Sequence, residues 1–129
     1  VDVNGLKEVN DRHGHEAGDR VILQVVALLQ GVTRSGDRVI RMGGDEFVVL
    51  CLNCDSNEAS RIIERIREAE RATTVTASDA EGRDKPIPLS FSLGSAASDS
   101  DSEERMMQLA DQRMYADKRE YYETRRRYR

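Results

Sequence analysis

The sequence predicts an α+β fold in which helices flank an antiparallel-containing sheet. Three observations support this prediction. Apolar residues recur at helical spacing within residues 19–34, and two β-rich runs at 38–42 and 46–52 flank a glycine turn in a hairpin pattern. The order strand, helices, hairpin, helix, strand and helix matches a ferredoxin-like βαββαβ core, with one added helix before the hairpin and one after the last strand.

Each predicted element has a local signal. Asp55–Asn57 offers an N-cap, Ser100 and Glu103 match a capping box, and the strand from Phe47 is continuously apolar, so we expect both of its faces to be covered. Residues 125–129 predict a solvated helix end. The expected elements are a strand end at 1–3, a helix at 4–12, a loop at 13–19, a helix at 19–34 with its stripe at Ile22, Val25, Val26 and Leu29, strands at 38–42 and 46–52, a helix at 57–71, a strand at 73–78, a loop at 80–86, a strand at 89–97 and a helix at 103–120.

Composition and charge narrow the possible classes of protein. A chain of 129 residues is expected to form one domain, 1–129. Its net charge of −4 disfavours general nucleic-acid binding, which depends on Lys and Arg neutralising phosphates. No apolar run is long enough for a membrane span. Cys51 and Cys54 form one CxxC pair without the second half of a zinc site, so we expect reduced thiols and a cytoplasmic location.

Three carboxylates are expected to meet at one edge of the predicted sheet. In a βαββαβ sheet the first strand pairs antiparallel with the third, so Asp2 lies beside Asp45 and Glu46. Like charges this close repel unless a cation lies between them, and oxygen ligands favour Mg²⁺ or Mn²⁺. An ordinary solvated hairpin turn is the alternative interpretation. Gly43 and Gly44, which allow a ligand close to the backbone, favour a binding site.

Several motifs spread over nearly the whole chain match one known family in order and spacing. They are DVNGLK at 2–7, Asn10–Asp11, GHEAGD at 14–19, RMGGDEF at 41–47, and Ala110–Asp111 followed by Tyr115 and Lys118. With these motifs the chain resembles the GGDEF-domain diguanylate cyclases, whose fold is a nucleotidyl-cyclase or palm-like form of the predicted core. The resemblance implies that two GTP molecules are joined into cyclic di-GMP with release of two pyrophosphates.

The resemblance implies a catalytic role for the residues around the turn. Asp2, the Val3 carbonyl and Asp45 resemble ligands of two Mg²⁺ or Mn²⁺ ions per active site. Asp45 resembles the general base, and Glu46 shares the acidic cluster. The metals would stabilise charge as the 3′-hydroxyl of one GTP attacks the α-phosphate of the other. Because each domain would hold one GTP, catalysis implies a homodimer.

Other matching residues resemble contacts to the guanine base. Asn10 and Asp19 resemble the base readers, because an ionised Asp can accept from both N1–H and N2–H₂ of guanine. His15 resembles a substrate contact in the same loop, with a loop-capping imidazole as the alternative. His13 matches no role, and we expect it on the surface.

A further group of residues resembles the phosphate-binding positions of the family. Lys7 and Lys118 resemble the lysines that hold the β- and γ-phosphates. The N–H groups of Gly5 and Leu6 open a helix, where the helix dipole favours an anion. In the same nucleotide site, Gly43 and Gly44 would let the substrate approach the backbone.

The segment before the hairpin resembles a regulatory site of the family. Arg34 and Asp37 form an R-x-x-D motif that ends shortly before Gly43, which is the spacing of the inhibitory product site. Arg can bind guanine or phosphate in a fork geometry, and Asp can accept from guanine donors. Arg41 would assist this site.

Three positions depart from the family pattern. Asn4 replaces a second Asp, Gly5 replaces a bulky residue, and Tyr122 replaces an arginine that contacts phosphate, for which Arg119 or Arg125 would be substitutes. Residues 1–3 have the pattern of the end of a strand, and the start of that strand is absent from the sequence. We therefore expect a segment of a longer, even membrane-anchored, protein with a regulatory or sensory domain upstream. The alternatives are a catalytically inactive module that binds GTP or cyclic di-GMP, and an intramolecular nucleotide cyclase.

Overall fold

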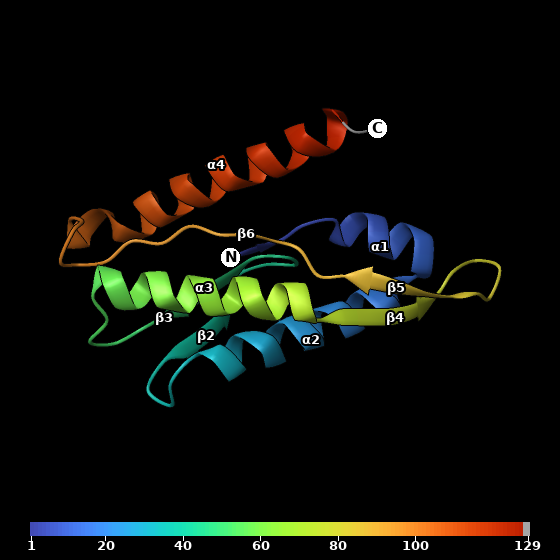
Figure 1. The fold of residues 1–129 in the computed structure, drawn as a ribbon, viewed down its shortest axis with the longest axis horizontal. Coiled ribbons are helices and arrows are strands. Elements are labelled where there is room, and N and C mark those ends of the chain that lie inside the picture. Colours follow the sequence, from blue (N-terminus) through green and yellow to red (C-terminus); the bar gives the residue numbers. More distant parts are fainter. Residues whose placement is uncertain (128–129) are drawn as a thin grey trace.

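The computed structural model describes residues 1–127, which form an α+β fold (Figure 1). None of the helices in this range is long and apolar enough to cross a membrane. The elements are β1 (Asp2–Val3), α1 (Leu6–His13), α2 (His15–Val32), β2 (Arg38–Arg41), β3 (Phe47–Leu50), α3 (Ser56–Ala72), β4 (Thr74–Ser78), β5 (Asp84–Pro88), β6 (Phe91–Ser92), a 3₁₀ turn (Glu103–Arg105) and α4 (Met106–Arg127).

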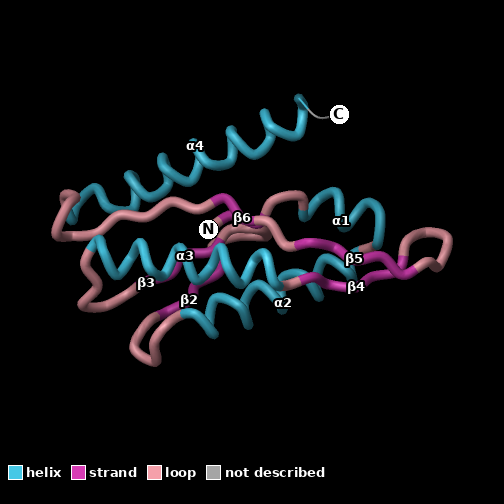
Figure 2. Tube along the Cα trace, in the orientation of Figure 1, coloured by secondary structure: helices cyan, strands magenta, loops and turns pink. Residues whose placement is uncertain are grey.

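The central strands run in the order β6–β1–β3–β2. β1 pairs antiparallel with β6, with Asp2 opposite Ser92, and β2 pairs antiparallel with β3, with Arg38 opposite Leu50. The Phe47 N–H donates to the Val1 carbonyl (2.8 Å), which joins the start of β3 to β1. The ferredoxin-like arrangement of first and third strands is therefore confirmed, although the strands are short (Figure 2).

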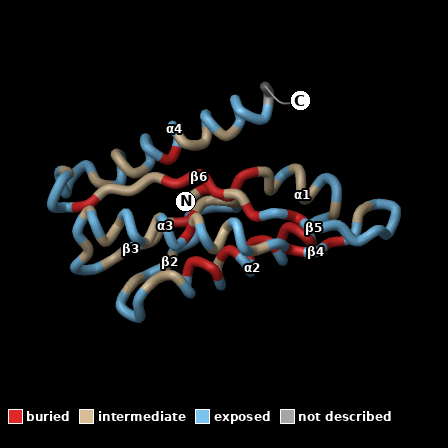
Figure 3. The backbone as a smooth tube through the Cα atoms, viewed as in Figure 1, coloured by how far each residue is buried: buried red, intermediate tan, exposed pale blue. Residues whose placement is uncertain are grey.

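The core lies between the central strands and the helices α2 and α3. Its largest fully buried side chains include Phe47 of β3 with Val25 and Leu29 of α2. The predicted apolar stripe of α2 is confirmed, since Ile22, Val25 and Leu29 are buried and Val26 packs against them. α4 lies along β6 on the side away from α2 (Figure 1). Buried residues concentrate along β6 and α2, and they alternate with exposed residues in β4 (Figure 3).

The loop predicted at 13–19 is wrong, because α2 begins at His15. Only Gly14, with φ +86°, separates α1 from α2. His13 is half-buried at the surface, and its Nδ1 lies 3.1 Å from the Ser78 carbonyl oxygen, a contact that links α1 to β4.

The loop predicted at 80–86 is wrong from Asp84 onward. Residues 84–88 form β5, which pairs with β4, and Ile87 is buried opposite Val75. Pro86 and Pro88 lie two residues apart, so both lack an N–H on the same edge of the strand. That edge has no neighbouring strand within residues 1–127, which is where proline is tolerated.

Three details of the predicted strands and caps are also corrected. The strand expected at 46–52 shortens to Phe47–Leu50, and its last residue, Leu50, is 48 % exposed, so β3 is not covered on both faces along its whole length within residues 1–127. The strand expected at 89–97 shortens to Phe91–Ser92.

Ser100 forms no capping box, since its Oγ bonds to Ala97 and Asp101, whereas the N-cap at Asp55 is confirmed. α4 continues to Arg127, and the last two residues of the predicted tail, 128–129, lie outside the described residues.

Candidate active site

Asp2 lies in β1 beside the turn that leads into β3. The Val3 N–H donates to the Asp45 carbonyl (2.8 Å), and Asp2 forms an isolated β-bridge with Glu46. Asp2 is buried, whereas Asp45 and Glu46 are half-buried. The backbones that carry these carboxylates are therefore neighbours, as the sequence predicts.

Lys118 of α4 is the ion partner of Asp2. Its Nζ lies 3.1 Å from Asp2 Oδ2, and the two side chains are 29 % and 8 % exposed. Burial raises the pKa of Asp2, and the hydrogen bond from Lys118 offsets only part of this effect because the Asp45 carboxylate adds to it. Burial opposes the charge of Lys118, but the hydrogen bond and the nearby carboxylates outweigh it and raise the pKa of Lys118. The raised pKa of Lys118 means that its charged form is stabilised in this pair, whereas the raised pKa of Asp2 means that its charged form is destabilised.

The second oxygen of Asp2 is left without a partner. Within residues 1–127 two carboxylate oxygens are buried and have no hydrogen-bond partner, Asp2 Oδ1 and Glu58 Oε2. A buried carboxylate oxygen without a partner carries a desolvation cost, which a cation or a donor would remove. This hard oxygen donor fits Mg²⁺ or Mn²⁺ by chemistry.

The predicted convergence of three carboxylates holds for the backbone. Residues 1–127 contain no group of three or more His, Cys, Asp or Glu side chains placed to hold a metal ion. Like charges repel when no cation lies between them. Lys118 supplies the counter-charge at Asp2.

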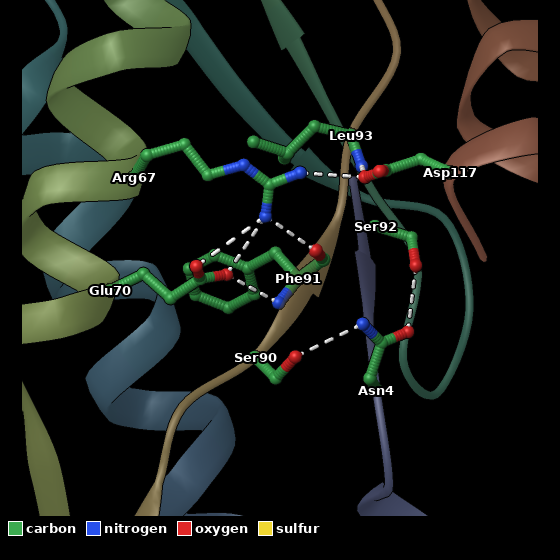
Figure 4. A network of polar contacts seen from close by, with 8 residues as sticks. All are labelled: Asn4, Arg67, Glu70, Ser90, Phe91, Ser92, Leu93 and Asp117. Carbon is green, nitrogen blue, oxygen red and sulfur yellow. Dashed lines mark hydrogen bonds and ion pairs between the residues drawn. The ribbon is translucent and has the colours of Figure 1, made fainter. Parts of the chain in front are cut away.

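Asn4 and Gly5 connect β1 to α1 and explain two departures from the family pattern. The buried Asn4 amide donates to Ser90 Oγ (3.2 Å) and accepts from Ser92 Oγ (2.8 Å), as Figure 4 shows. An ionised aspartate could not donate to Ser90. Gly5 has φ +74°, a left-handed conformation that a bulky side chain would strain. Asn4 is therefore a structural amide, a role that its position in the sequence did not reveal.

The predicted guanine-reading residues lie at the contact between α1 and α2. Gly18 passes so close to Asn10 that a Cβ at position 18 would overlap the Asn10 carboxamide. Asp19 follows Gly18 directly and is exposed, and His15 is exposed one helical turn earlier on α2. The structure therefore brings Asn10, Asp19 and His15 to one end of the molecule.

Two further basic residues lie near the start of α1. Lys7 is exposed in the first turn of α1. Arg125 of α4 reaches the same region, with Nη1 about 4.0 Å from the position of a Cβ on Gly5 and 3.7 Å from Glu8 Oε2. Of the two substitutes for the arginine missing at Tyr122, Arg125 is thus placed near the predicted phosphate-binding helix start.

A network of charged side chains fastens β6 between α3 and α4 (Figure 4). Arg67 Nη1 donates to the Phe91 carbonyl (2.7 Å), and its Nη2 pairs with Asp117 Oδ2 (2.6 Å). The Phe91 N–H donates to Glu70 Oε2 (2.6 Å), and the Leu93 N–H donates to Asp117 Oδ2 (2.7 Å). These side chains form hydrogen bonds with the backbone N–H and C=O groups on the outer edge of β6, where a further strand would otherwise pair. Because Asp117 precedes Lys118, the network also fixes the segment of α4 that faces Asp2.

The predicted product-site residues occupy the turn between α2 and β2. The Asp37 side chain is 2 % exposed, and its Oδ2 accepts from the Arg34 N–H (2.8 Å), so this carboxylate stabilises the turn itself. The Arg34 guanidinium donates to the Leu52 carbonyl (3.3 Å) and lies 3.5 Å from Glu58 Oε2. Arg41 instead binds the Gly43 and Gly44 carbonyls (3.1 and 2.7 Å) and supports the glycine turn.

Arg34 and Asp37 line a cleft of about 250 Å³ between α2 and α3. Arg61 and Arg65 of α3 line it as well, which the sequence reasoning did not find. Their spacing of four residues places them on one face of a helix, and this is the available signal. The other lining residues are Val32, Glu58 and Ile62. The cleft thus combines three arginines with two acidic residues.

Known proteins resemble the chain over most of its length. A family model described as diguanylate cyclase, GGDEF domain, matches residues 1–124. Diguanylate cyclase DosC of Escherichia coli (strain K12) is 38 % identical over 120 residues, which are 92 % of this chain and 25 % of DosC. Diguanylate cyclase A of Treponema denticola is 30 % identical over 118 residues, which cover 92 % of this chain and 31 % of that protein. The chain therefore spans a quarter to a third of the length of these relatives.

Solved structures share the fold. The GGDEF domain of TpbB (YfiN) from Pseudomonas aeruginosa superposes with a TM-score of 0.73 at 31 % identity, covering 92 % of this chain and 68 % of that chain. Diguanylate cyclase SiaD, solved with its activator SiaC from the same organism, superposes with a TM-score of 0.76 at 26 % identity, covering 92 % and 44 %. The chain belongs to the GGDEF-domain diguanylate cyclase family.

Proposed function

We propose that this domain condenses two GTP molecules into cyclic di-GMP and releases two pyrophosphates. The observation that carries the proposal is the buried Asp2 with its unsatisfied Oδ1, placed beside the Asp45–Glu46 turn and the Lys118 cation. A buried carboxylate with one unsatisfied oxygen, carried by an inner strand, suits a ligand that brings positive charge. Family membership supports the reaction class.

The base of GTP would bind at the contact between α1 and α2. Asp19 is exposed there and would accept from N1–H and N2–H₂ of guanine, a donor pair that adenine lacks. The Asn10 carboxamide would contact the remaining base edge, and His15 lies one turn from Asp19 on the same helix. This arrangement favours guanine over adenine.

The triphosphate would lie between the start of α1 and α4. The N–H groups of Gly5 and Leu6 open α1, with Lys7, Lys118 and Arg125 around them. Asp2, the Val3 carbonyl and Asp45 would hold two divalent ions. Bound Mg²⁺ or Mn²⁺ supplies positive charge to the phosphates as the new bond forms.

The remaining residues of the turn would position and activate the attacking group. Asp45 is half-buried beside Asp2 and would accept the proton of the 3′-hydroxyl. Glu46 would add negative charge to the metal-binding region. Arg41 binds the Gly43 and Gly44 carbonyls. These bonds would keep the turn in a shape that admits the substrate.

Each domain would present one GTP, so two domains must face each other, and we include a homodimer in the proposal. The lengths of the relatives support a further part of the polypeptide that carries a sensory or regulatory domain. The arginine cleft beside Arg34 supports product inhibition, because fork-shaped guanidinium groups bind phosphate and guanine.

Product analysis with purified protein, Mg²⁺ or Mn²⁺ and GTP tests this proposal. We expect cyclic di-GMP by chromatography, with a specific activity that rises with protein concentration. Asp45→Ala should lower synthesis roughly 100- to 1,000-fold without changing the melting temperature. Glu64→Gln, which changes an exposed α3 carboxylate, is the control and should behave as the wild type.

The alternative functions give different products. Intact GTP under several metals and protein concentrations, together with binding of GTP or cyclic di-GMP, would replace the proposal with an inactive binding module. Formation of monomeric cyclic GMP, at a specific activity independent of protein concentration, would indicate an intramolecular cyclase.

A further inference from the structure

Lys118 contacts Asp2 at the point where a divalent cation would have to bind. Its Nζ lies 3.1 Å from Asp2 Oδ2, which leaves the buried Oδ1 unsatisfied. A lysine ammonium is a compact point charge with three donors, and it neutralises one carboxylate without satisfying all of its oxygens. The pair therefore holds part of the charge that a divalent ion would supply, at the same carboxylate.

The backbone around Lys118 is fixed, so the side chain alone can leave Asp2. Asp117 accepts from the Leu93 N–H (2.7 Å) and pairs with Arg67 (2.6 Å) (Figure 4). Nearer the start of α4, a Cβ on Gly94 would overlap the Ala110 carbonyl and the Met114 N–H, so the helix lies directly against the chain after β6. The Lys118 side chain is 29 % exposed and has a flexible four-carbon stem. It can turn toward solvent while α4 stays in place.

We propose that Lys118 is a built-in counter-cation of Asp2, so that a divalent ion binds Asp2 tightly only when a phosphate group draws the lysine away. Without nucleotide, a metal ion must displace Lys118 and face the repulsion of its charge. With a nucleotide, the anionic phosphates give the ammonium a new partner, and both oxygens of Asp2 become available. Metal binding and phosphate binding are then coupled through one side chain. The phosphate half of this inference rests on the proposed function, whereas the competition at Asp2 does not.

Mn²⁺ titration of the nucleotide-free protein, read from the electron paramagnetic resonance signal of free Mn²⁺, tests the competition. Lys118→Gln should bind Mn²⁺ about tenfold more tightly than the wild type, because the competing charge is gone. Lys118→Arg keeps a cation and should stay within about twofold of the wild type. Lys85→Gln removes the same charge from β5, away from Asp2, and should also match the wild type. Thermal melts identify any variant that fails to fold, and Lys118→Met replaces Lys118→Gln in that case.

Asp2→Asn combined with Lys118→Gln shows where the ion binds. The gain in Mn²⁺ affinity should disappear in the double variant. Equal Mn²⁺ affinity of the wild type and Lys118→Gln would overturn the inference, as would a gain that persists in the double variant.

A non-hydrolysable GTP analogue tests the coupling. In the wild type the analogue should raise Mn²⁺ affinity severalfold more than it does in Lys118→Gln, since binding free energies are reciprocal. Equal enhancement in both proteins would overturn the phosphate half. Failure of the proposed function has a separate signature: no analogue binding and no turnover of GTP, with the Mn²⁺ difference between wild type and Lys118→Gln still present.

Discussion

Asp2 and Asp37 are both almost inaccessible, with side chains 8 % and 2 % exposed, and each lies beside a basic residue. They are used differently. Asp37 accepts from the Arg34 N–H and holds its own turn, whereas Asp2 keeps one buried oxygen without a partner. Burial and a basic neighbour therefore do not identify a functional carboxylate. An unsatisfied oxygen is a further sign, because the protein bears a desolvation cost that a ligand would remove. Glu58 Oε2 shares this state, so the sign points to Asp2 only together with its place beside Asp45 and Glu46.

The same contrast extends to the surroundings of the two aspartates. Around Asp2 one lysine provides the compensating charge, and the site would gain positive charge from a metal. Around Asp37 the cleft holds Arg34, Arg61 and Arg65, and it would gain negative charge from a ligand. Because Asp37 is already engaged, we expect the arginines rather than this carboxylate to provide most of the product affinity.

Replacing each of the two aspartates in turn should give the largest difference in activity between variants. Asp2→Asn should lower cyclic di-GMP synthesis roughly 100-fold or more, since the charge that binds metal is lost, with little change in unfolding free energy. Asp37→Ala should instead cost about 1 kcal/mol of stability, because the Arg34 N–H loses its acceptor, while synthesis persists. Turnover assays and urea unfolding measure both effects. If the Asp37→Ala protein were fully folded yet as inactive as the Asp2→Asn protein, the distinction between a functional Asp2 and a structural Asp37 would be wrong.

Arg67→Ala tests whether the network on β6 supports the Asp2 region. Removal of the guanidinium leaves Glu70 and Asp117 without their shared cation, and these carboxylates are only partly exposed. We expect about 2 kcal/mol of destabilisation in urea unfolding. Synthesis should fall more at limiting Mg²⁺ than at saturating Mg²⁺, because Lys118 and Asp2 lose their alignment. Arg71→Ala, an exposed arginine four residues later on α3, is the matched control and should change neither quantity.

Arginine replacements test the proposed product-binding role of the cleft beside Asp37. Arg34→Ala and Arg65→Gln should each weaken inhibition by added cyclic di-GMP about tenfold and raise product accumulation, because a charge-assisted contact is lost. Initial rates at low product should stay unchanged. The inhibition constant measures the effect, and Arg71→Gln serves as the control. Equal inhibition of wild type and both variants would remove the proposed product site.

A third aspartate provides a pH reference with the smallest expected effect. The Arg113 guanidinium and the Ala97 N–H lower the pKa of Asp101 to about 2 from its ordinary value of 3.8. A lowered pKa means stability that is present above about pH 4 and lost as the pH falls toward 2. The pKa of Asp2 is raised, so its ionisation costs stability as the pH rises.

The unfolding midpoint measured from pH 6 to pH 2 checks this difference in sign. The stability difference between wild type and Asp101→Asn should shrink on acidification. The difference between wild type and Asp2→Asn should shift in favour of the wild type over the same range. Parallel pH profiles for the two variants would show that Asp2 is not desolvated as the structure indicates.

Much of the fold follows from local sequence signals. The stripe at Ile22, Val25 and Leu29 predicts α2 because helical periodicity is a direct consequence of backbone geometry. The hairpin around Gly43–Gly44 is predicted equally well. β5 is not predicted because the polar segment up to Pro86, with Gly82, favours a loop. Only the pairing with β4 shows that Pro86 and Pro88 lie on the free edge of a strand.

Some features of the candidate site can likewise be predicted from the sequence, and others cannot. The motifs place Asp2 beside Asp45 and Glu46, because antiparallel pairing of first and third strands brings these backbones together. The motifs also suggest Asn10 and Asp19. They do not reveal that Arg61 and Arg65 share a cleft with Asp37, since this depends on how α3 packs. The bond of Asp37 to the Arg34 N–H is local to the turn, but the motif alone does not show it.

The sequence by itself determined the family, the periodic helices, the hairpin and the proximity of the acidic residues. Only the tertiary structure decided that Lys118, 116 residues away, is the ion partner of Asp2. It also decided that, within residues 1–127, no three carboxylates are placed together to hold a metal ion. The reason is physical: local patterns fix backbone conformation, whereas the charge balance of a buried group depends on side chains that distant segments bring to it.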